Sequence, residues 1–329
     1  MGFANSPHSL HVNQLLTDFT QKRMNADKQF IYPKVVTVSP RDKLADTYAV
    51  YDQTHLVRHT LDRAPGGPKN LIDEKFTTST YTMKQIEAAV KIAEESVENA
   101  DPAVRPDVSA ASIVSQQMQI RRETDAASLI FTKGNYNDQT GTAGHVATLG
   151  GSRLWSSYTN SINALSPIRQ IMSAMRTVTT AVLGDYGEFV LVLGDQAWEV
   201  LVNHPSVLAR IENVRPTGAD VMWQGSTLAS ILGVKAVLIG LSGYNSAVEG
   251  ATTVMSRLWT GTKAALVLAP QTIARETEAF GVMFRHKDYP KVKRYTDDTV
   301  DSDIVDEKDY YVFQSTNTSA GFLWDTAVS

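Results

Sequence analysis

Two histidines four residues apart, His55 and His59, have the spacing of two zinc ligands on one helix. A zinc protease helix with this spacing carries a glutamate directly after its first histidine, whereas this chain has Leu56 there. The surrounding residues are typical of a loop or a strand, and no third ligand lies nearby in the sequence. We therefore interpret both as surface or lightly packed histidines, and we expect no metal and no other cofactor.

An acidic run near the C-terminus is the second candidate, because clustered carboxylates can hold calcium. An EF-hand loop needs a glycine at its turn and carboxylates at fixed positions, and this run has neither. A basic stretch precedes it, so we expect a solvated acidic loop that pairs with that stretch within the chain, with pairing across a subunit interface as the alternative. The acidic residues are Asp297, Asp298, Asp301, Asp303, Asp306, Glu307 and Asp309, and the basic ones are Arg285, Lys287, Lys291, Lys293 and Arg294.

Glycine-rich segments could cradle phosphates, but those at 141–144 and 149–152 lack both the dinucleotide fingerprint and the Gly-Lys-Ser/Thr ending of a phosphate loop. A predicted strand at 189–193 leads through Gly194 into a helix, which is a nucleotide position in some α/β folds, yet Asp195 would repel phosphate there. No Gly-x-Ser-x-Gly motif is present to place a serine nucleophile. The sequence therefore predicts a protein that is not an enzyme.

The composition of the chain narrows the possible kinds of protein further. The chain has 329 residues, 43% of them hydrophobic, which suits a globular core. Its net charge of -4 predicts only weak, local contact with nucleic acid. It has no cysteine, which fits folding in a reducing cytoplasm. No basic and apolar leader precedes Lys22, and no apolar run approaches the ~20 residues of a membrane span, so we expect neither export nor membrane insertion.

The first third of the chain is patterned for an arm and a hairpin. Residues 1–29 are polar and aperiodic, which predicts an arm that orders only against a partner. Alternating runs at Tyr48–Tyr51 and Lys75–Thr82 flank a segment rich in Pro and Gly. A two-stranded ribbon of this length is marginal alone, so we expect it to lie on a neighbouring molecule. The residues of its tip are Arg63, Ala64, Pro65, Gly66, Gly67, Pro68 and Lys69.

Two helices are predicted next. Apolar residues recur at helical spacing over 83–99, with Thr82 and Gln85 as a capping box. After Pro102 and Pro106, Asp107 can cap a longer helix that reaches about Thr132, which we expect to be the rigid spine of the molecule. The apolar stripe of the first helix consists of Met83, Ile86, Val90, Ala93 and Val97.

The second half is patterned for α/β layers. Ser166 and Pro167 begin a helix with Ile168, Ile171, Met172, Met175 and Val182 on one stripe. A helix carrying Trp198, Leu201 and Val202 follows strand 189–193, and a short helix is expected at 226–232. Strands are predicted at 234–240, 264–268, 291–295 and 310–314.

The order of these segments resembles that of major capsid proteins of tailed bacteriophages with the Hong Kong 97-like fold. The likeness runs from about Phe30 to the C-terminus, and no single piece of it is specific. The similar stretches are Asn135-Tyr136, Leu154-Trp155, Ser166-Pro167-Ile168, Val192-Leu193-Gly194 with Trp198, Asn203-His204-Pro205-Ser206-Val207, Leu232-Gly233-Val234, Tyr244-Asn245, Leu258-Trp259 and Phe280-Gly281.

The resemblance implies an α+β fold with an N-terminal arm at 1–34, an extended β-hairpin loop at 35–82 and a peripheral domain at 83–166 that contains the spine helix. An axial domain at 167–270 and a return to the peripheral domain at 271–329 would complete it. Such a subunit self-assembles into hexamers and pentamers of an icosahedral head that encloses double-stranded DNA. It forms in the host bacterial cytoplasm, matures from a procapsid and ends in the virion capsid.

The partners that the resemblance implies are further copies of the chain, a separate scaffolding protein, a portal and a cement protein, with weak non-specific contact to packaged DNA. We expect contacts between subunits at Arg63, Pro65, Gly66, Gly67 and Lys69 of the loop tip, and at Asp301, Asp303 and Asp306 of the acidic run. Two alternatives remain: the shell of an encapsulin-like bacterial compartment, and a soluble α/β nucleotide-binding enzyme.

Overall fold

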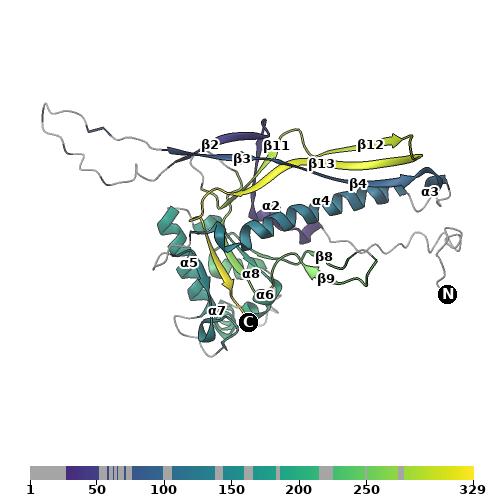
Figure 1. Cartoon of the computed structure of the whole chain (residues 1–329). Coiled ribbons are helices and arrows are strands. Elements are labelled where there is room, and N and C mark those ends of the chain that lie inside the picture. Colours follow the sequence, from purple (N-terminus) through teal and green to yellow (C-terminus); the bar gives the residue numbers. More distant parts are fainter. Residues whose placement is uncertain are drawn as a thin grey trace.

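The computed structural model describes residues 27–51, 58, 62, 65, 70–71, 76–98, 106–137, 144–158, 166–182, 186–214, 225–248, 250–272 and 278–329 (Figure 1). Two five-stranded sheets form its framework, and two separate two-stranded ribbons accompany them. A long helix, α4, runs beneath one sheet, and a group of shorter helices surrounds the other (Figure 1). No helix in these residues is long and apolar enough to cross a membrane.

The first sheet has the order β1-β11-β13-β12, and β4 pairs with the other side of β13. The 14-residue strand β13 is therefore its centre, with β11 and β12 beside different parts of its length. All pairs are antiparallel except β1 with β11, which is parallel. The bounds are β1 Thr37–Arg41, β4 Lys84–Ala93, β11 Gly281–His286, β12 Lys291–Asp297 and β13 Ser302–Ser315.

The second sheet has the order β5-β14-β10-β6-β7 and holds the main core. Every residue of β6 and β10 is buried, which matches the continuous apolar sequences Phe-Val-Leu-Val-Leu and Ala-Ala-Leu-Val-Leu. The predicted strands at 189–193 and 264–268 are confirmed. The bounds are β5 Val146–Thr148, β6 Phe189–Leu193, β7 Ala236–Ile239, β10 Ala264–Leu268 and β14 Gly321–Thr326.

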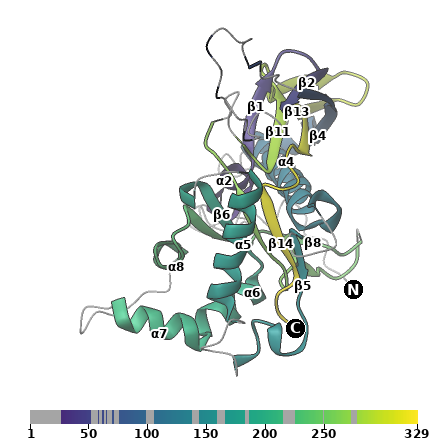
Figure 2. The same ribbon diagram turned by 90° about the vertical axis from the view of Figure 1, so that its left-hand side faces the viewer.

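Helices α5 to α8 pack around this second sheet, with α5 in front of it in Figure 2. Helix α5 begins at Pro167, as predicted, and buries Ile168, Ile171 and Met175. Met172, which we expected on the same stripe, is 40% exposed, because the buried stripe turns through Ala174 instead. The bounds are α5 Pro167–Val182, α6 Asp195–Asn203, α7 Pro205–Val214 and α8 Gly225–Leu232.

The predicted helix at 83–99 is wrong over most of its length. The chain forms strand β4 there, and only Glu94–Glu98 is helical (α3). Strand β4 lies beside β13 with Ile86 opposite Asp309 and Val90 opposite Val305. Ile86, Ala88, Val90 and Ile92 alternate with more exposed residues, so the segment also fits a strand period, and pairing with a strand more than 200 residues away decides between the two.

The predicted spine helix is confirmed as α4, Pro106–Phe131, a helix of 26 residues. It lies along β13 and β4 (Figure 1). Its buried residues recur every fourth position at Ala110, Val114, Met118, Ala126 and Ile130. The position between Met118 and Ala126 in this stripe belongs to Arg122, which is also buried.

The acidic run is not the solvated loop that we expected, because most of it lies within β13. Glu307 and Asp309 are buried and face Arg122, whose Nη2 lies 2.7 Å from Glu307 Oε1 and 2.9 Å from Asp309 Oδ2. Arg285 donates to both oxygens of Asp309 at 3.0 and 2.8 Å. The pairing of the acidic run with the basic stretch is thus intramolecular, and these charges balance one another inside the protein.

This cluster keeps the spine helix ionically bound to the sheet. Burial lowers the pKa of Arg122, but its hydrogen bond with Glu307 and the charge of Asp309 outweigh that effect and raise the pKa overall. The guanidinium therefore stays charged. A buried ion pair adds little net stability, yet removal of one partner leaves the other charge buried and unpaired.

We predict that Arg122→Met lowers the free energy of unfolding by about 3–5 kcal/mol, because the buried carboxylates of Glu307 and Asp309 lose their ion pairs with Arg122. The matched control is Arg121→Met. The side chain of Arg121 is 55% exposed, and its ion pair with Asp125 is worth about 0.2–1 kcal/mol. Urea denaturation of the protein measures both. Equal effects of the two substitutions would contradict this account of the spine helix.

Candidate functional site

A buried carboxylate on the spine helix joins three separate parts of the chain. Glu123 has no exposed surface. Its Oε2 accepts from the backbone N–H of Tyr32 at 3.0 Å, and its Oε1 accepts from that of Ile31, also at 3.0 Å. Oε1 accepts as well from Trp259 Nε1 at 2.6 Å and from Ser242 Oγ at 3.3 Å.

The residues that meet at Glu123 come from different elements. Ile31 and Tyr32 begin the short helix α2 (Tyr32–Val35), which has no capping side chain of its own. Ser242 precedes the ribbon β8–β9 (Gly243–Asn245 and Met255–Arg257), and Trp259 follows it. Trp259 is buried edge-on against Phe131 of α4, with ring centroids 5.2 Å apart. The carboxylate thus fixes the start of the described fold and the base of β8–β9 to the spine helix.

The protonation of Glu123 is sensitive to this setting. Burial raises the pKa of its carboxyl and outweighs the hydrogen bonds from Ile31, Trp259, Tyr32 and Ser242, which lower it. In the unfolded chain the carboxyl of Glu123 has its ordinary pKa of 4.5. Unfolding is therefore linked to pH through this residue.

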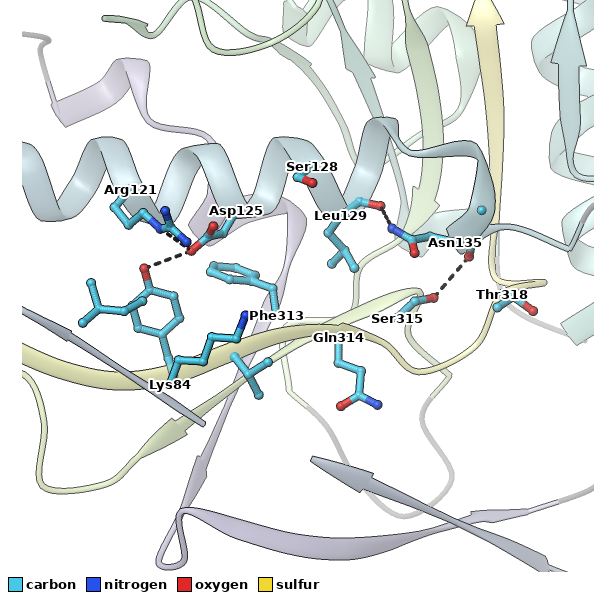
Figure 3. A pocket seen from close by; sticks show the side chains of 14 residues that line it. Lys84, Arg121, Asp125, Ser128, Leu129, Asn135, Phe313, Gln314, Ser315 and Thr318 are labelled. Carbon is cyan, nitrogen blue, oxygen red and sulfur yellow. Dashed lines mark hydrogen bonds and ion pairs between the residues drawn. The ribbon is translucent and has the colours of Figure 1, made fainter. Parts of the chain in front are cut away.

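A surface depression of about 490 Å³ lies between the end of α4 and β13 (Figure 3). Its polar groups bind one another: Asp125 accepts from Arg121 Nε at 3.1 Å and from the Tyr311 hydroxyl at 3.3 Å. Asn135 Nδ2 donates to the carbonyl of Leu129 at 2.8 Å, which caps the helix end. Its lining residues include Lys84, Ser128 and Thr318, and neither histidine nor cysteine is among them.

The structure describes only some of the other candidates for chemistry. His55 and His59 lie outside the described residues, and no group of three or more potential metal ligands occurs within them. His204 is buried beside Ser206, and burial lowers its pKa, so it is neutral at pH 7. Segment 141–144 is described only at Gly144, whereas Gly151 begins a short 3-10 helix.

The start of α6 leaves no room for a phosphate. Its amides are already bonded, that of Gln196 to Asp195 Oδ1 at 2.9 Å and that of Ala197 to the carbonyl of Gly261 at 3.0 Å. A Cβ on Gly194 would collide with the carbonyls of Thr260 and Gly261. The strand end that resembles a nucleotide position is therefore closed by its own chain.

The ribbon β2–β3 leaves the body of the molecule (Figure 1). Strands β2 (Ala45–Tyr51) and β3 (Phe76–Thr82) are antiparallel and confirm the predicted runs. At its base Tyr81 stacks on Phe284 of β11 with centroids 4.6 Å apart, whereas Phe76 at the far end is 60% exposed. The base of the ribbon is thus anchored to the first sheet.

The residues that we expected at subunit contacts lie in different surroundings. Of the tip, Pro65 is described and exposed, while Arg63, Gly66, Gly67 and Lys69 lie outside the described residues. Asp301 is exposed in the β12–β13 turn, and Asp303 binds Arg294 at 2.6 Å. Asp306 is 6% exposed and so presents almost no surface to a neighbour. Contact between the tip and the acidic run stays a prediction.

Sequence reasoning missed Arg122 and Glu123. A signal for Arg122 was present, because it stands four residues after Met118 and four before Ala126 on an apolar stripe. A charged residue in such a stripe indicates a buried partner. The partners of Glu123 are backbone groups and Trp259, which no local pattern connects to it.

Solved structures with the same arrangement are shell proteins and a phage-related protein. A phage-related protein of Bordetella bronchiseptica matches with a TM-score of 0.66 at 16% identity, over 95% of each chain. The capsid of the cyanophage P-SCSP1u matches at 0.61 and 12% identity, over 94% of this chain and 92% of that one. The chain therefore has the Hong Kong 97-like fold, as the resemblance predicted.

That fold is shared beyond phages. The encapsulin SrpI of Synechococcus elongatus matches with a TM-score of 0.51 at 11% identity, over 94% of this chain and 92% of that one. No protein-family model and no curated protein matches the sequence. The fold is thus established, and the function rests on further argument.

We predict that Glu123→Gln lowers the free energy of unfolding by about 1–3 kcal/mol, because the new amide group faces a buried backbone N–H. The raised pKa in the folded state gives wild type a stabilising contribution that is complete below pH 4.5 and is lost as the pH rises through the folded-state pKa. The deficit of the variant should therefore be largest at acidic pH and shrink toward neutral pH.

Denaturation of the unassembled subunit at several pH values measures this difference. The control is Glu199→Gln on the exposed face of α6, which should change little at any pH. A deficit that grows with rising pH would show that Glu123 is stabilised as the carboxylate instead.

Proposed function

We propose that this chain is the major shell subunit of a tailed-bacteriophage head, a structural protein without an active site. The observation that carries the proposal is the fold, because the likeness to phage capsid chains extends over nearly the whole length of both. The closed start of α6 adds support, because its first amides are already bonded within the chain and are not free to bind a phosphate. The subunit works by geometry: copies form hexamers and pentamers, and these close into an icosahedral container for double-stranded DNA.

The ribbon and the N-terminal arm supply the contacts that such a container needs. The base of ribbon β2–β3 is held by stacking of Tyr81 on Phe284 and by a hydrogen bond from Gln314 Nε2 to the carbonyl of Thr80, and we propose that the rest of the ribbon gains stability against another copy. Each contact is small, but a shell repeats it at every subunit and the contributions accumulate. In this proposal 1–34 is the arm, 35–82 the extended loop, 83–166 with 271–329 the peripheral domain and 167–270 the axial domain.

A scaffolding protein, a portal and a cement protein are the further partners, and packaged DNA is held by weak contacts since the net charge is -4. Assembly takes place in the host bacterial cytoplasm, and the product is the virion capsid. The second candidate is a bacterial compartment shell, which the likeness to an encapsulin favours. Such a shell encloses a cargo protein instead of DNA.

We predict that the protein, expressed with its scaffolding protein, sediments as closed particles or as hexamers and pentamers. Velocity sedimentation measures this directly. Nuclease-resistant DNA in particles from infected cells supports the phage head, and a protein cargo without DNA supports the compartment. A stable monomer or dimer at high concentration would exclude both shells.

A further prediction concerns the loop tip. Arg63→Glu with Lys69→Glu should lower the temperature at which particles dissociate, more at low salt than at high salt, and leave melting of the unassembled subunit unchanged. Each exposed pair is worth only about 0.2–1 kcal/mol, but every subunit repeats it. The control, Arg63→Lys with Lys69→Arg, keeps both charges. Light scattering during heating gives the dissociation temperature, and loss of subunit folding would mean that the tip packs within its own chain.

A further inference from the structure

Helix α5 carries positive charge and no negative charge. Its 16 residues include Arg169 and Arg176 but neither aspartate nor glutamate. The two arginines are seven residues apart, about two helical turns, so they lie on the same face of the helix. Both are exposed. The exposed side of α5 is therefore basic, although the net charge of the whole chain is -4.

The surroundings of α5 do not neutralise this charge. Among the elements that pack against it, α8 and β10 have no charged residue, and α7 has one of each sign, Arg210 and Glu212. Asp325 of β14 binds Lys263 at 2.6 Å instead. Within the part of the chain that the structure describes, neither arginine of α5 forms an ion pair.

Further hydrogen-bond donors lie along the same side of the helix. Ser173 is exposed between the two arginines, four residues after Arg169 and three before Arg176. A third arginine, Arg153, is exposed beside the start of α5, where its carbonyl accepts from Gln170 Nε2 at 3.0 Å. Guanidinium groups bind phosphate with two parallel hydrogen bonds, and serine hydroxyls are frequent donors to phosphate oxygens. This surface therefore has the chemistry that binds phosphate.

The composition of the surface distinguishes between two kinds of anionic partner. The buried centre of a protein interface is rich in apolar side chains, whereas Met172, at 40% exposure, is the only large apolar residue that α5 exposes. The other exposed residues of the helix are Arg169, Ser173, Arg176 and Thr180. Such a surface favours the phosphates of a nucleic acid over the carboxylates of another protein, and the proposed shell encloses double-stranded DNA.

We propose that the exposed face of α5 binds the phosphate backbone of double-stranded DNA through Arg169 and Arg176, with Arg153 beside the start of the helix. This inference rests on the proposed shell function and adds to it the surface that meets the DNA. The side of the second sheet that α5 covers, which faces the viewer in Figure 2, then borders the interior of the shell. Because the contacts are made to phosphates alone, binding has no sequence preference and weakens as the salt concentration rises.

The test measures the affinity of the full-length, unassembled subunit for a short DNA duplex of arbitrary sequence, by fluorescence anisotropy at several salt concentrations. For B-DNA the slope of log K against log salt changes by about 0.9 for each phosphate contact. Arg169→Gln with Arg176→Gln should therefore make the slope shallower by about 1.8 and weaken binding at low salt. A second duplex of different sequence should bind the wild-type protein with the same affinity.

Two control pairs separate a defined surface from general charge. Lys291→Gln with Lys293→Gln removes the same amount of charge from exposed positions of β12 and should leave the slope unchanged. Arg169→Lys with Arg176→Lys keeps both charges, so the slope should be retained. An equal change of slope in the β12 variant, or wild-type protein that does not bind the duplex, would overturn the proposal.

A cysteine placed on the helix locates this surface in the assembled shell. Arg176→Cys introduces the only cysteine of the chain. In closed particles without DNA, a small maleimide should label it, and a maleimide attached to a large polymer that the shell excludes should not. DNA inside the particles should slow the labelling by the small reagent. Labelling by the polymer would place α5 on the outside, and protection from the small reagent in empty particles would place it between copies; either result contradicts the DNA contact.

The DNA contact and the shell function fail separately. Particles built from a subunit whose salt slope does not depend on the two arginines would refute the DNA contact and leave the shell standing. A slope that depends on Arg169 and Arg176, in a protein that never forms particles, would support the contact and refute the shell. Failure of both measurements would refute both.

Discussion

The fold depends on the carboxyl group of Glu123, which is buried on α4. An acid without solvent is costly unless its oxygens are bonded, and here backbone amides of Ile31 and Tyr32, a hydroxyl and an indole bind them. Those donors belong to the start of the described fold, to the base of β8–β9 and to the loop after it. One residue thus fixes both Ile31–Tyr32 and Trp259 to the spine helix.

The neighbouring Arg122 binds α4 to the first sheet through ion pairs with Glu307 and Asp309 of β13. Together the two adjacent charges hold α4 on both sides, without disulfides, in a chain that has no cysteine. Ribbon β2–β3 and the turn of the β12–β13 hairpin lie at opposite ends of the first sheet (Figure 1).

Local patterns predicted the elements whose burial is simple. Strands β6 and β10 are recognisable as continuous apolar runs. Pro167 marks the start of α5, and the long helix α4 is also recognisable from its local sequence. Strand β4 and the acidic part of β13 were not predicted correctly, because β13 makes β4 a strand and α4 supplies the partner that allows carboxylates inside. The same limit hid Glu123, whose partners lie as far as 136 residues away. The order of segments identified the fold, but not the interactions that fix it.

The account distinguishes a buried body from strands that become covered on assembly. Hydrogen exchange of backbone amides, compared between unassembled protein and assembled particles, tests this distinction most directly. The account predicts strong protection of β6, β10 and the amides of Ile31 and Tyr32 in both states, because they belong to the fixed body. Strands β2 and β3 should exchange rapidly in the subunit and become protected on assembly. Unchanged exchange of these two strands on assembly, or protection of β6 and β10 that arises only in particles, would contradict it.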